Sequence, residues 1–549
     1  MKSGLNILIG PNSDIRRLKL AIRVFMVMLM FCAQTYTLHA QLQSQNSSVR
    51  IVEIYGSSPA ILPSMGGSGV SYLSGVSGLR INPANVQFNS EKKWTVKLGL
   101  LSMVHPNIST TTNKKTDLSS WLMTFEPYEP VTASPVNSLP QNQSELNRLF
   151  TDSSKPTHFR SSITQELLSV GFHNDQVSIG LYAEYVFKQS FQVNRGWYDK
   201  EYYPSPSGLK RSQWLAHDEI NYLAVGLNYS ERLDILSDFT PVSDQFSLGF
   251  SPRVILAGSR SMSRSESAYF SGNNELIESF IIETAGLYSD YLNSLHQGNS
   301  PSTIPIPDID HRYAASLNDF KDGLGFGMDI GLRYTRNLSN ELSLVSKENT
   351  KVARSISVAF SVSDIGYIEY AEGLSIEPFI RSESQSEPLN MDAAVEQNLA
   401  FYEGSPEQYF YFLETNGQLE NLLTEPLTRT KTTVLLPTQA QLGVHLLWNR
   451  WSVQADIQHA FFSTFSSVPS WIYSAGASLQ PLKGIVFSGG YTQSTIWGDD
   501  FSLGLRLAGS MVELELSGRW PVSNNNGKML PSSVGFSGIN FRFYVLDSK

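Results

Sequence analysis

Residues 325–335 read GFGMDIGLRYT, a stretch in which apolar residues alternate strictly with small or polar ones. Phe326 and Met328 fall on one side of this alternation, and Gly327 and Asp329 fall on the other. Successive side chains of a β-strand point to opposite faces of the sheet. The stretch therefore predicts a strand with one apolar and one polar face.

The same alternation recurs along most of the chain. It is clear over residues 355–362, 501–507 and 512–520, and further segments begin near Trp94, Leu168, Val177, Leu223, Phe246, Ala440, Trp451, Trp471 and Ile485. We count about fourteen segments of roughly 9–11 residues, the length that a tilted strand needs to cross a bilayer. A secreted β-sandwich or propeller also alternates, but soluble strands average only about 5–6 residues. The pattern favours an all-β fold, a transmembrane antiparallel β-barrel of about 14 strands.

The connections between these segments fall into two classes. Asn449-Arg450 is a very short junction, whereas residues 104–162, 189–218, 258–323 and 381–430 form long predicted loops. Short turns at one rim and long loops at the other are typical of outer-membrane barrels. Residues 91–549 are therefore assigned to the barrel.

The composition supports a sheet protein and argues against some partners. Of the 549 residues, 17% are charged and 41% are hydrophobic, below the ~25% and ~45–50% of typical globular domains. The formal net charge is −9, which disfavours a nucleic-acid partner because phosphates require clustered Lys and Arg.

The N-terminus predicts export. Residues 1–40 combine basic residues, an apolar run over 24–33 and a small residue, Ala40, at a plausible cleavage point. This arrangement is typical of a secretory signal peptide. The only cysteine, Cys32, lies inside it, and Phe31 before it disfavours a lipoprotein cysteine. The mature chain is then expected to lack disulfides, thiolate zinc sites and cysteine nucleophiles.

Residues 41–90 precede the first clear strand and do not alternate. This glycine-rich stretch ends in Gly78-Leu79-Arg80-Ile81-Asn82-Pro83-Ala84, where Asn before Pro favours a turn. The run resembles the N-terminal hatch motif of FadL-type barrels and their Bacteroidota relatives, the FadL/PorV-like family, and residues 325–334 and 363–368 resemble uncharacterised barrels of that branch. The resemblance implies a fourteen-strand barrel plugged by its N-terminus, with Gly78, Asn82, Pro83 and Ala84 as hatch residues. Such barrels often pass hydrophobic compounds, whereas PorV-like relatives serve protein secretion.

Two long loops are predicted to carry helices. Phe280, Leu287 and Tyr291 recur at helical spacing within residues 274–296, and residues 405–413 open with a capping box. The apolar stripe of the first helix is a candidate binding site for a hydrophobic ligand. Packing against the barrel mouth is the alternative.

Charged residues on the polar faces have mixed sign. The predicted luminal charges are Lys97, Glu184, Lys188, Asp329, Arg333, Asp456, Arg506, Glu513, Glu515 and Arg519. Ion-selective pores use rings of a single sign, so the mixed set is better explained by ion pairs and hydrogen bonds that hold a plug to the wall.

The sequence contains no recognisable catalytic or metal-binding motif. None of its nine histidines forms HExxH, and His445 and His459 on neighbouring predicted strands have no evident third ligand. We expect no cofactor, no metal and no enzymatic activity, although the pattern alone leaves an outer-membrane hydrolase open. The predicted function is a gated passive channel for small hydrophobic compounds, embedded in outer-membrane lipid. The alternative is a non-transporting anchor or subunit of a protein secretion or surface-assembly complex.

Overall fold

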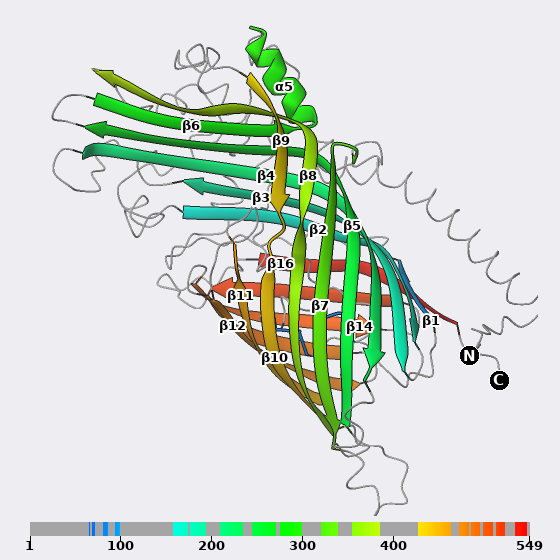
Figure 1. Ribbon diagram of the computed structural model, residues 1–549. Coiled ribbons are helices and arrows are strands. Elements are labelled where there is room, and N and C mark those ends of the chain that lie inside the picture. Colours follow the sequence, from blue (N-terminus) through cyan, green and yellow to red (C-terminus); the bar gives the residue numbers. More distant parts are fainter. Residues whose placement is uncertain are drawn as a thin grey trace, which may run out of the picture.

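The computed structural model describes most of the sheet and part of the segment that precedes it (Figure 1). The described residues are 65, 68–71, 81–85, 94–98, 157–173, 176–193, 209–233, 244–270, 275–298, 320–338, 354–384, 427–462, 471–482, 485–494, 498–508, 512–521 and 533–545. The predicted signal peptide, Gly78 and the helix expected over 405–413 lie outside them.

Sixteen strands and one helix are described, and all the strands belong to one sheet. The elements are β1 (Trp94–Leu98), β2 (Thr157–His173), β3 (Val177–Val193), β4 (Leu209–Arg232), β5 (Asp244–Phe270), β6 (Glu275–Ala285), α5 (Leu287–His296), β7 (Gly323–Asn337), β8 (Arg354–Ser384), β9 (Leu427–Leu435), β10 (Gln439–Trp448), β11 (Trp451–Ala460), β12 (Trp471–Leu482), β13 (Ile485–Ser494), β14 (Gly498–Ala508), β15 (Val512–Pro521) and β16 (Ser533–Val545).

Fourteen of these strands form a closed antiparallel ring. Neighbours in sequence pair from β1 to β5 and from β10 to β16, and β16 pairs with β1. The pairs β5–β7, β7–β8 and β8–β10 complete the circle. The other two strands, β6 and β9, pair with the ends of β5 and β8 beyond the ring. The predicted barrel of about 14 strands is confirmed.

The two faces of the ring have opposite polarity to those of a soluble protein. Large apolar side chains are exposed on the outside, including Leu181, Leu227, Val254, Phe326, Phe360, Leu442, Val453 and Leu503. Small and amide side chains are buried on the inside, including Asn228, Ser251, Ser361, Gln454, Ser478, Thr492 and Ser502. A closed sheet with an apolar outer face is the β structure that can span hydrocarbon, because all of its backbone groups are paired.

Aromatic side chains mark both ends of the apolar band. At the short-turn end Trp448 and Trp451 are exposed, and the guanidinium of Arg354 lies 4.0 Å from the centre of the Trp448 ring. At the other end Trp471 stacks on His459, with ring centroids 4.4 Å apart. Such girdles form where a barrel meets the membrane interface.

One side of the wall continues far beyond the ring. β8 has 31 residues, about 100 Å at roughly 3.3 Å per residue, against about 30 Å of bilayer hydrocarbon. Register shifts in β2, in the β4–β5 pair and in β8 follow one another across neighbouring strands, and β-bulges bend strands. Beyond them the strands turn away from the lower wall (Figure 1). We call the parts of β2–β6, β8 and β9 beyond these shifts the distal sheet.

The distal sheet corrects the predicted loops. Parts of residues 104–162, 189–218, 258–323 and 381–430 are strands. β2 begins before the end of the first range, β3 and β4 extend into the second, β5 and β6 occupy part of the third, and β8 and β9 extend into the fourth. In β5 the residues after Gly258 are mostly Ser, Arg and Glu on both faces. A strand outside the membrane needs no continuous apolar face, so hydrophobic alternation did not reveal it.

The helix predicted within 274–296 is only half correct. Residues 275–285 form β6, and α5 begins at Leu287. Ser289 of α5 hydrogen-bonds Thr284 through their hydroxyl oxygens, 3.2 Å apart. Thr284 points away from the inward-facing Glu283, so α5 lies on the outer face of the distal sheet.

Within the described ranges no helix is long and apolar enough to cross a membrane.

Candidate functional site

The inner face of the wall is divided into a polar half and an apolar half. Toward the short-turn end it carries the buried Ser, Asn and Gln residues named above. Toward the distal sheet eleven buried apolar side chains from β3, β4, β5, β6, β8, β9 and the residue after β9 form one cluster, which we call the apolar belt: Val186, Ile220, Tyr222, Ala224, Ile255, Ala257, Ala285, Ile368, Tyr370, Val434 and Leu436.

Part of the chain before β1 lies inside the polar half. We call its described residues, 65, 68–71 and 81–85, the luminal segment; all of them are buried. At one end of the segment the carboxylate of Asp456 in β11 accepts the backbone N–H groups of Gly69 at 2.5 Å and Val70 at 2.9 Å. Gln454 donates to the carbonyl and hydroxyl oxygens of Ser68, both at 2.8 Å.

The other end of the segment is a turn bound to strands that lie two to four places from β11 around the ring. The side-chain oxygen of Asn82 accepts the N–H of Ala84 at 2.9 Å, as in an Asx turn. The Asn82 amide donates to the Leu332 and Phe360 carbonyls at 3.2 and 3.4 Å. Ser247 of β5 donates to the Ala84 carbonyl at 3.1 Å. The segment thus follows the inner wall from β11 past β10 to β8, β7 and β5.

Glycines in the wall make room for this segment. A Cβ at Gly249, Gly331, Gly443 or Gly476 would meet Pro83, Asn82, Val70 or Met65, respectively, at less than 3.0 Å. Real Cβ atoms essentially never approach so closely. Each glycine belongs to a different strand, so the segment is fitted to the wall at four places.

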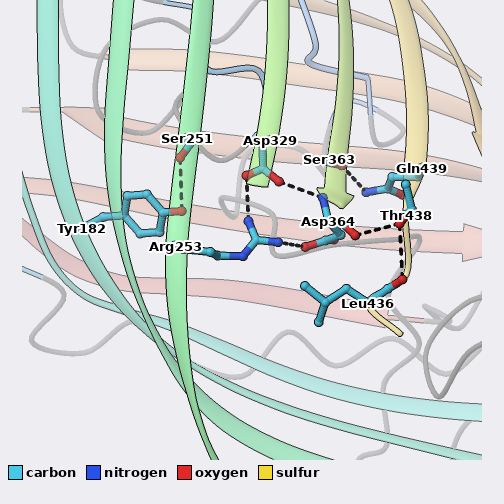
Figure 2. Close-up of polar contacts among 9 residues, drawn as sticks. All are labelled: Tyr182, Ser251, Arg253, Asp329, Ser363, Asp364, Leu436, Thr438 and Gln439. Carbon is cyan, nitrogen blue, oxygen red and sulfur yellow. Dashed lines mark hydrogen bonds and ion pairs between the residues drawn. The ribbon is translucent and has the colours of Figure 1, made fainter. Parts of the chain in front are cut away.

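Figure 2 shows a buried ionic cluster around Arg253 of β5. Along β5, Arg253 lies between Gly249, which faces Pro83 of the luminal segment, and Ile255 of the apolar belt. Arg253 of β5 pairs with Asp329 of β7 at 2.7 Å and with Asp364 of β8. Asp329 also accepts the N–H of Asp364 at 2.7 Å. Asp364 has a φ of 57°, uncommon for a residue with a side chain, so the carboxylate of Asp329 holds β8 in its irregular conformation.

The same irregularity continues into the neighbouring strand. Thr438, between β9 and β10, donates to the Asp364 carbonyl at 2.8 Å, and Gln439 donates to Ser363 at 3.0 Å (Figure 2). Gly366 has a φ of 153°, and a Cβ there would meet the carbonyl of Phe326. Side chains thus replace part of the β8–β10 ladder at this level.

The luminal residues predicted from the sequence are distributed unevenly. Asp329 belongs to the ionic cluster. Arg333 lies inside the wall and donates to Ser357 at 3.5 Å. Arg506 is paired across β14 and β15 with Glu515 in the strand register. Glu513, Glu515 and Arg519 are on β15, but their side chains lie outside the described part of the structure.

The remaining predicted site residues also differ in their outcome. Asn82, Pro83 and Ala84 lie in the luminal segment against the wall. Phe280 is on β6, while Leu287 and Tyr291 are on α5, so the three do not share a helix face as predicted. β-strand pairing with β5 and β8 overrides the helical spacing around Phe280.

Sequence reasoning placed Asp456 among the luminal charges without singling it out as an anchor, and it missed Gln454, Arg253 and Asp364. Asp456 and Arg253 stand at polar positions of alternating strands, which marks them as luminal but not as anchors. Among the described residues no group of His, Cys, Asp and Glu could hold a metal ion.

Comparisons with known proteins give a family and several distant structures. Residues 83–514 match a family described as "Family of unknown function (DUF5723)". A search of curated proteins gave no match. The chain is similar to the Pseudomonas putida toluene transporter TodX, at 11% identity over 90% of this chain and 98% of that one, with a TM-score of 0.39. It is also similar to the Ralstonia pickettii toluene transporter TbuX, at 12% identity over 89% and 98%, with a TM-score of 0.38. These TM-scores are too low to support a shared function.

Proposed function

The chain belongs to the DUF5723 family, whose function is unknown, and from its barrel we propose that it is a passive outer-membrane channel for small hydrophobic compounds. The luminal segment acts as its gate. The observation that carries this proposal is the segment itself, which lies in the polar half of the lumen and is attached by side-chain hydrogen bonds to strands of the wall from β5 to β11.

The apolar belt supports a hydrophobic cargo. Sites for small apolar ligands have mainly apolar walls with few polar groups, and the belt is the described part of the inner face with that character. It lies on the distal side of the luminal segment. A compound that enters from the distal sheet would therefore meet the belt first and the segment second.

The polar attachment of the segment supports a gating role. A hydrogen bond within a protein is worth only about 0.5–1.5 kcal/mol net, because water replaces it when it breaks. The strand ladder of the wall does not depend on these contacts. The segment can therefore leave its place while the barrel stays closed on itself. In this proposal the protein has no enzymatic role.

The test is uptake of a neutral fluorescent hydrophobic probe, 1-N-phenylnaphthylamine, into liposomes that contain the protein and have lipopolysaccharide in the outer leaflet, because a plain phospholipid bilayer takes up this probe unaided. Deletion of residues 41–85 is expected to raise the uptake rate over that of the full chain. Ile255→Ser combined with Ile368→Ser in the full chain is expected to lower it, because both side chains are buried in the belt. Exposed Asp290→Ala on α5 is the control.

Heat-modifiable migration in electrophoresis verifies that each variant has formed a barrel. If the folded deletion variant and the folded belt variant both take up the probe at the wild-type rate, the channel proposal is wrong.

The distal sheet favours a second candidate function. Strands that extend far outside the bilayer present a large surface, and a barrel that serves as an anchor or subunit of a secretion or surface-assembly complex would use it. A stoichiometric partner that copurifies with the full chain, together with no uptake above empty liposomes, would favour this role.

A further inference from the structure

We propose that the lumen contains a binding site for an oxyanion, built on Arg333 at the short-turn side of the luminal segment. This site goes beyond the channel function and does not depend on it.

Arg253 and Arg260 are buried arginines that pair with carboxylates of the chain. Arg253 pairs with two carboxylates, those of Asp329 and Asp364. Arg260, in the distal part of β5, is 3.0 Å from Glu283 and 3.8 Å from Asp218. The chain itself therefore supplies the counter-charges of these two arginines.

Arg333 differs from both. Its hydrogen-bond partner is the hydroxyl of Ser357 at 3.5 Å. The residue is half-buried, but its Nε is enclosed and has no partner among the side chains that the structure describes. No carboxylate among those side chains contacts this guanidinium. An enclosed charge without a counter-charge is costly, so its retention points to an anion that comes from outside the chain.

The surroundings of Arg333 suit an oxyanion. Ser357, which bonds Arg333, is also 2.9 Å from the hydroxyl of Thr335. The cross-strand partner of Ser357 in β10 is His445. The Nε2 of His445 is 2.9 Å from the hydroxyl of Ser452. Hydroxyl and imidazole groups thus stand beside a planar guanidinium with free donors, the combination that binds carboxylate or phosphate groups.

The position of this cluster connects it to the luminal segment. Ser247 donates to the carbonyls of both Ala84 and Arg333, at 3.1 and 3.4 Å. Asp456 of β11 lies in the same cross-strand row as Arg333, three strands away, and its Oδ2 accepts the amides of Gly69 and Val70. An anion bound to Arg333 would therefore lie next to the end of the segment.

The shared ligand chemistry is an oxyanion, and it has two possible sources. One is a free small anion from the solution at the short-turn end. The other is the anionic head group of an amphiphile within the lumen.

The experiment is isothermal titration of the full-length protein in a non-ionic detergent at about 0.15 M NaCl, where exposed charges are screened. The titrants are inorganic phosphate, hexyl phosphate and neutral 1-hexanol. The wild type is expected to bind at least one of the two phosphates saturably. Tighter binding of hexyl phosphate, with no binding of hexanol, would assign the site to an amphiphile head group; equal binding of both phosphates would assign it to a free anion.

Variants identify the site. Arg333→Gln is expected to weaken binding about tenfold or more, and Arg333→Lys less, because Lys keeps the charge but loses the fork of donors. Arg450→Gln is the matched control, since Arg450 is exposed in the β10–β11 turn. Ser357→Ala should weaken binding with little effect on the wall, which keeps the test valid should Arg333→Gln fail to fold. Absence of saturable binding of either phosphate to the wild type, or equal binding to folded Arg333→Gln, would overturn the proposal.

Discussion

Replacement of Asp456 by Ala should release one end of the luminal segment. The carboxylate accepts two backbone N–H groups, at 2.5 and 2.9 Å, and its side chain is buried on the inner wall. Hydrogen bonds to charged groups contribute about 1.5–3 kcal/mol each. Loss of both bonds therefore removes at least about 3 kcal/mol of the free energy that holds the segment against the wall. Since about 1.4 kcal/mol corresponds to a factor of ten in an equilibrium constant, the detached population should rise about 100-fold.

The release can be measured as chemical accessibility of the segment. Ser71 is fully buried, and the native chain has a single cysteine, Cys32, within the predicted signal peptide. With Cys32 replaced by Ser, the variant Ser71→Cys carries one thiol whose maleimide labelling rate follows the detached fraction. We expect Asp456→Ala to label about 100 times faster than the Asp456 parent, and Asp456→Asn to fall between them because it keeps an acceptor but loses the charge.

Asp290→Ala provides the control, because it removes a carboxylate from the exposed face of α5. The barrel should remain folded in every variant, as judged by heat-modifiable migration. Equal labelling rates for Asp456→Ala and its parent, with rapid labelling of the unfolded protein, would refute the view that Asp456 anchors the segment.

Three further predictions concern the wall. Val444→Arg, at an exposed outer position, should destabilise the barrel in lipid by about 2–4 kcal/mol, whereas Gln441→Arg on the inner face of the same strand should fold normally; urea unfolding in vesicles compares them. Gly249→Ala introduces a Cβ against the backbone of Pro83 and should accelerate labelling of the luminal segment without loss of the barrel, and unchanged labelling would contradict the fit described above. Arg253→Gln leaves two buried carboxylates without their partner and should lower the free energy of unfolding by about 3–5 kcal/mol in the same assay. An unchanged free energy of unfolding would mean that water solvates the cluster.

The ring of strands was predictable because its physical cause is local in the sequence. A strand between lipid and a polar lumen must alternate, and Phe326 and Gly327 illustrate this, since the first is exposed on the outer face and the second faces Arg253. The two-residue turn at Asn449 was equally predictable from the sequence. Asn449 has a φ of 57°, which Asn tolerates. The distal sheet lies outside this rule. Its strands are stabilised by pairing with their neighbours, so apolar periodicity did not reveal them.

The site was predictable only where a short motif carries the geometry. Asn82 and Pro83 predicted a turn, and the structure has one, bound to the wall. The anchor Asp456 is 386 residues away from Val70 in the chain, and the contact follows from closure of the whole ring. The same holds for Arg253 and Asp364, 111 residues apart. No local pattern distinguishes such residues from any other polar residue that faces the lumen.

The contrast between the two buried polar systems shows how the wall could stay rigid while the proposed gate is released. Arg253 and its two carboxylates connect β5, β7 and β8, so their rupture would leave buried charges unpaired within the wall itself. The luminal segment is held instead mainly by single hydrogen bonds to backbone groups and amides, which water can replace at a net cost of about 0.5–1.5 kcal/mol each. The contact with Asp456 of β11 is the exception, because its carboxylate is charged. Substitution of Asp456 therefore tests whether the lumen opens by release of the segment, because it removes the strongest of these contacts and leaves the wall unchanged.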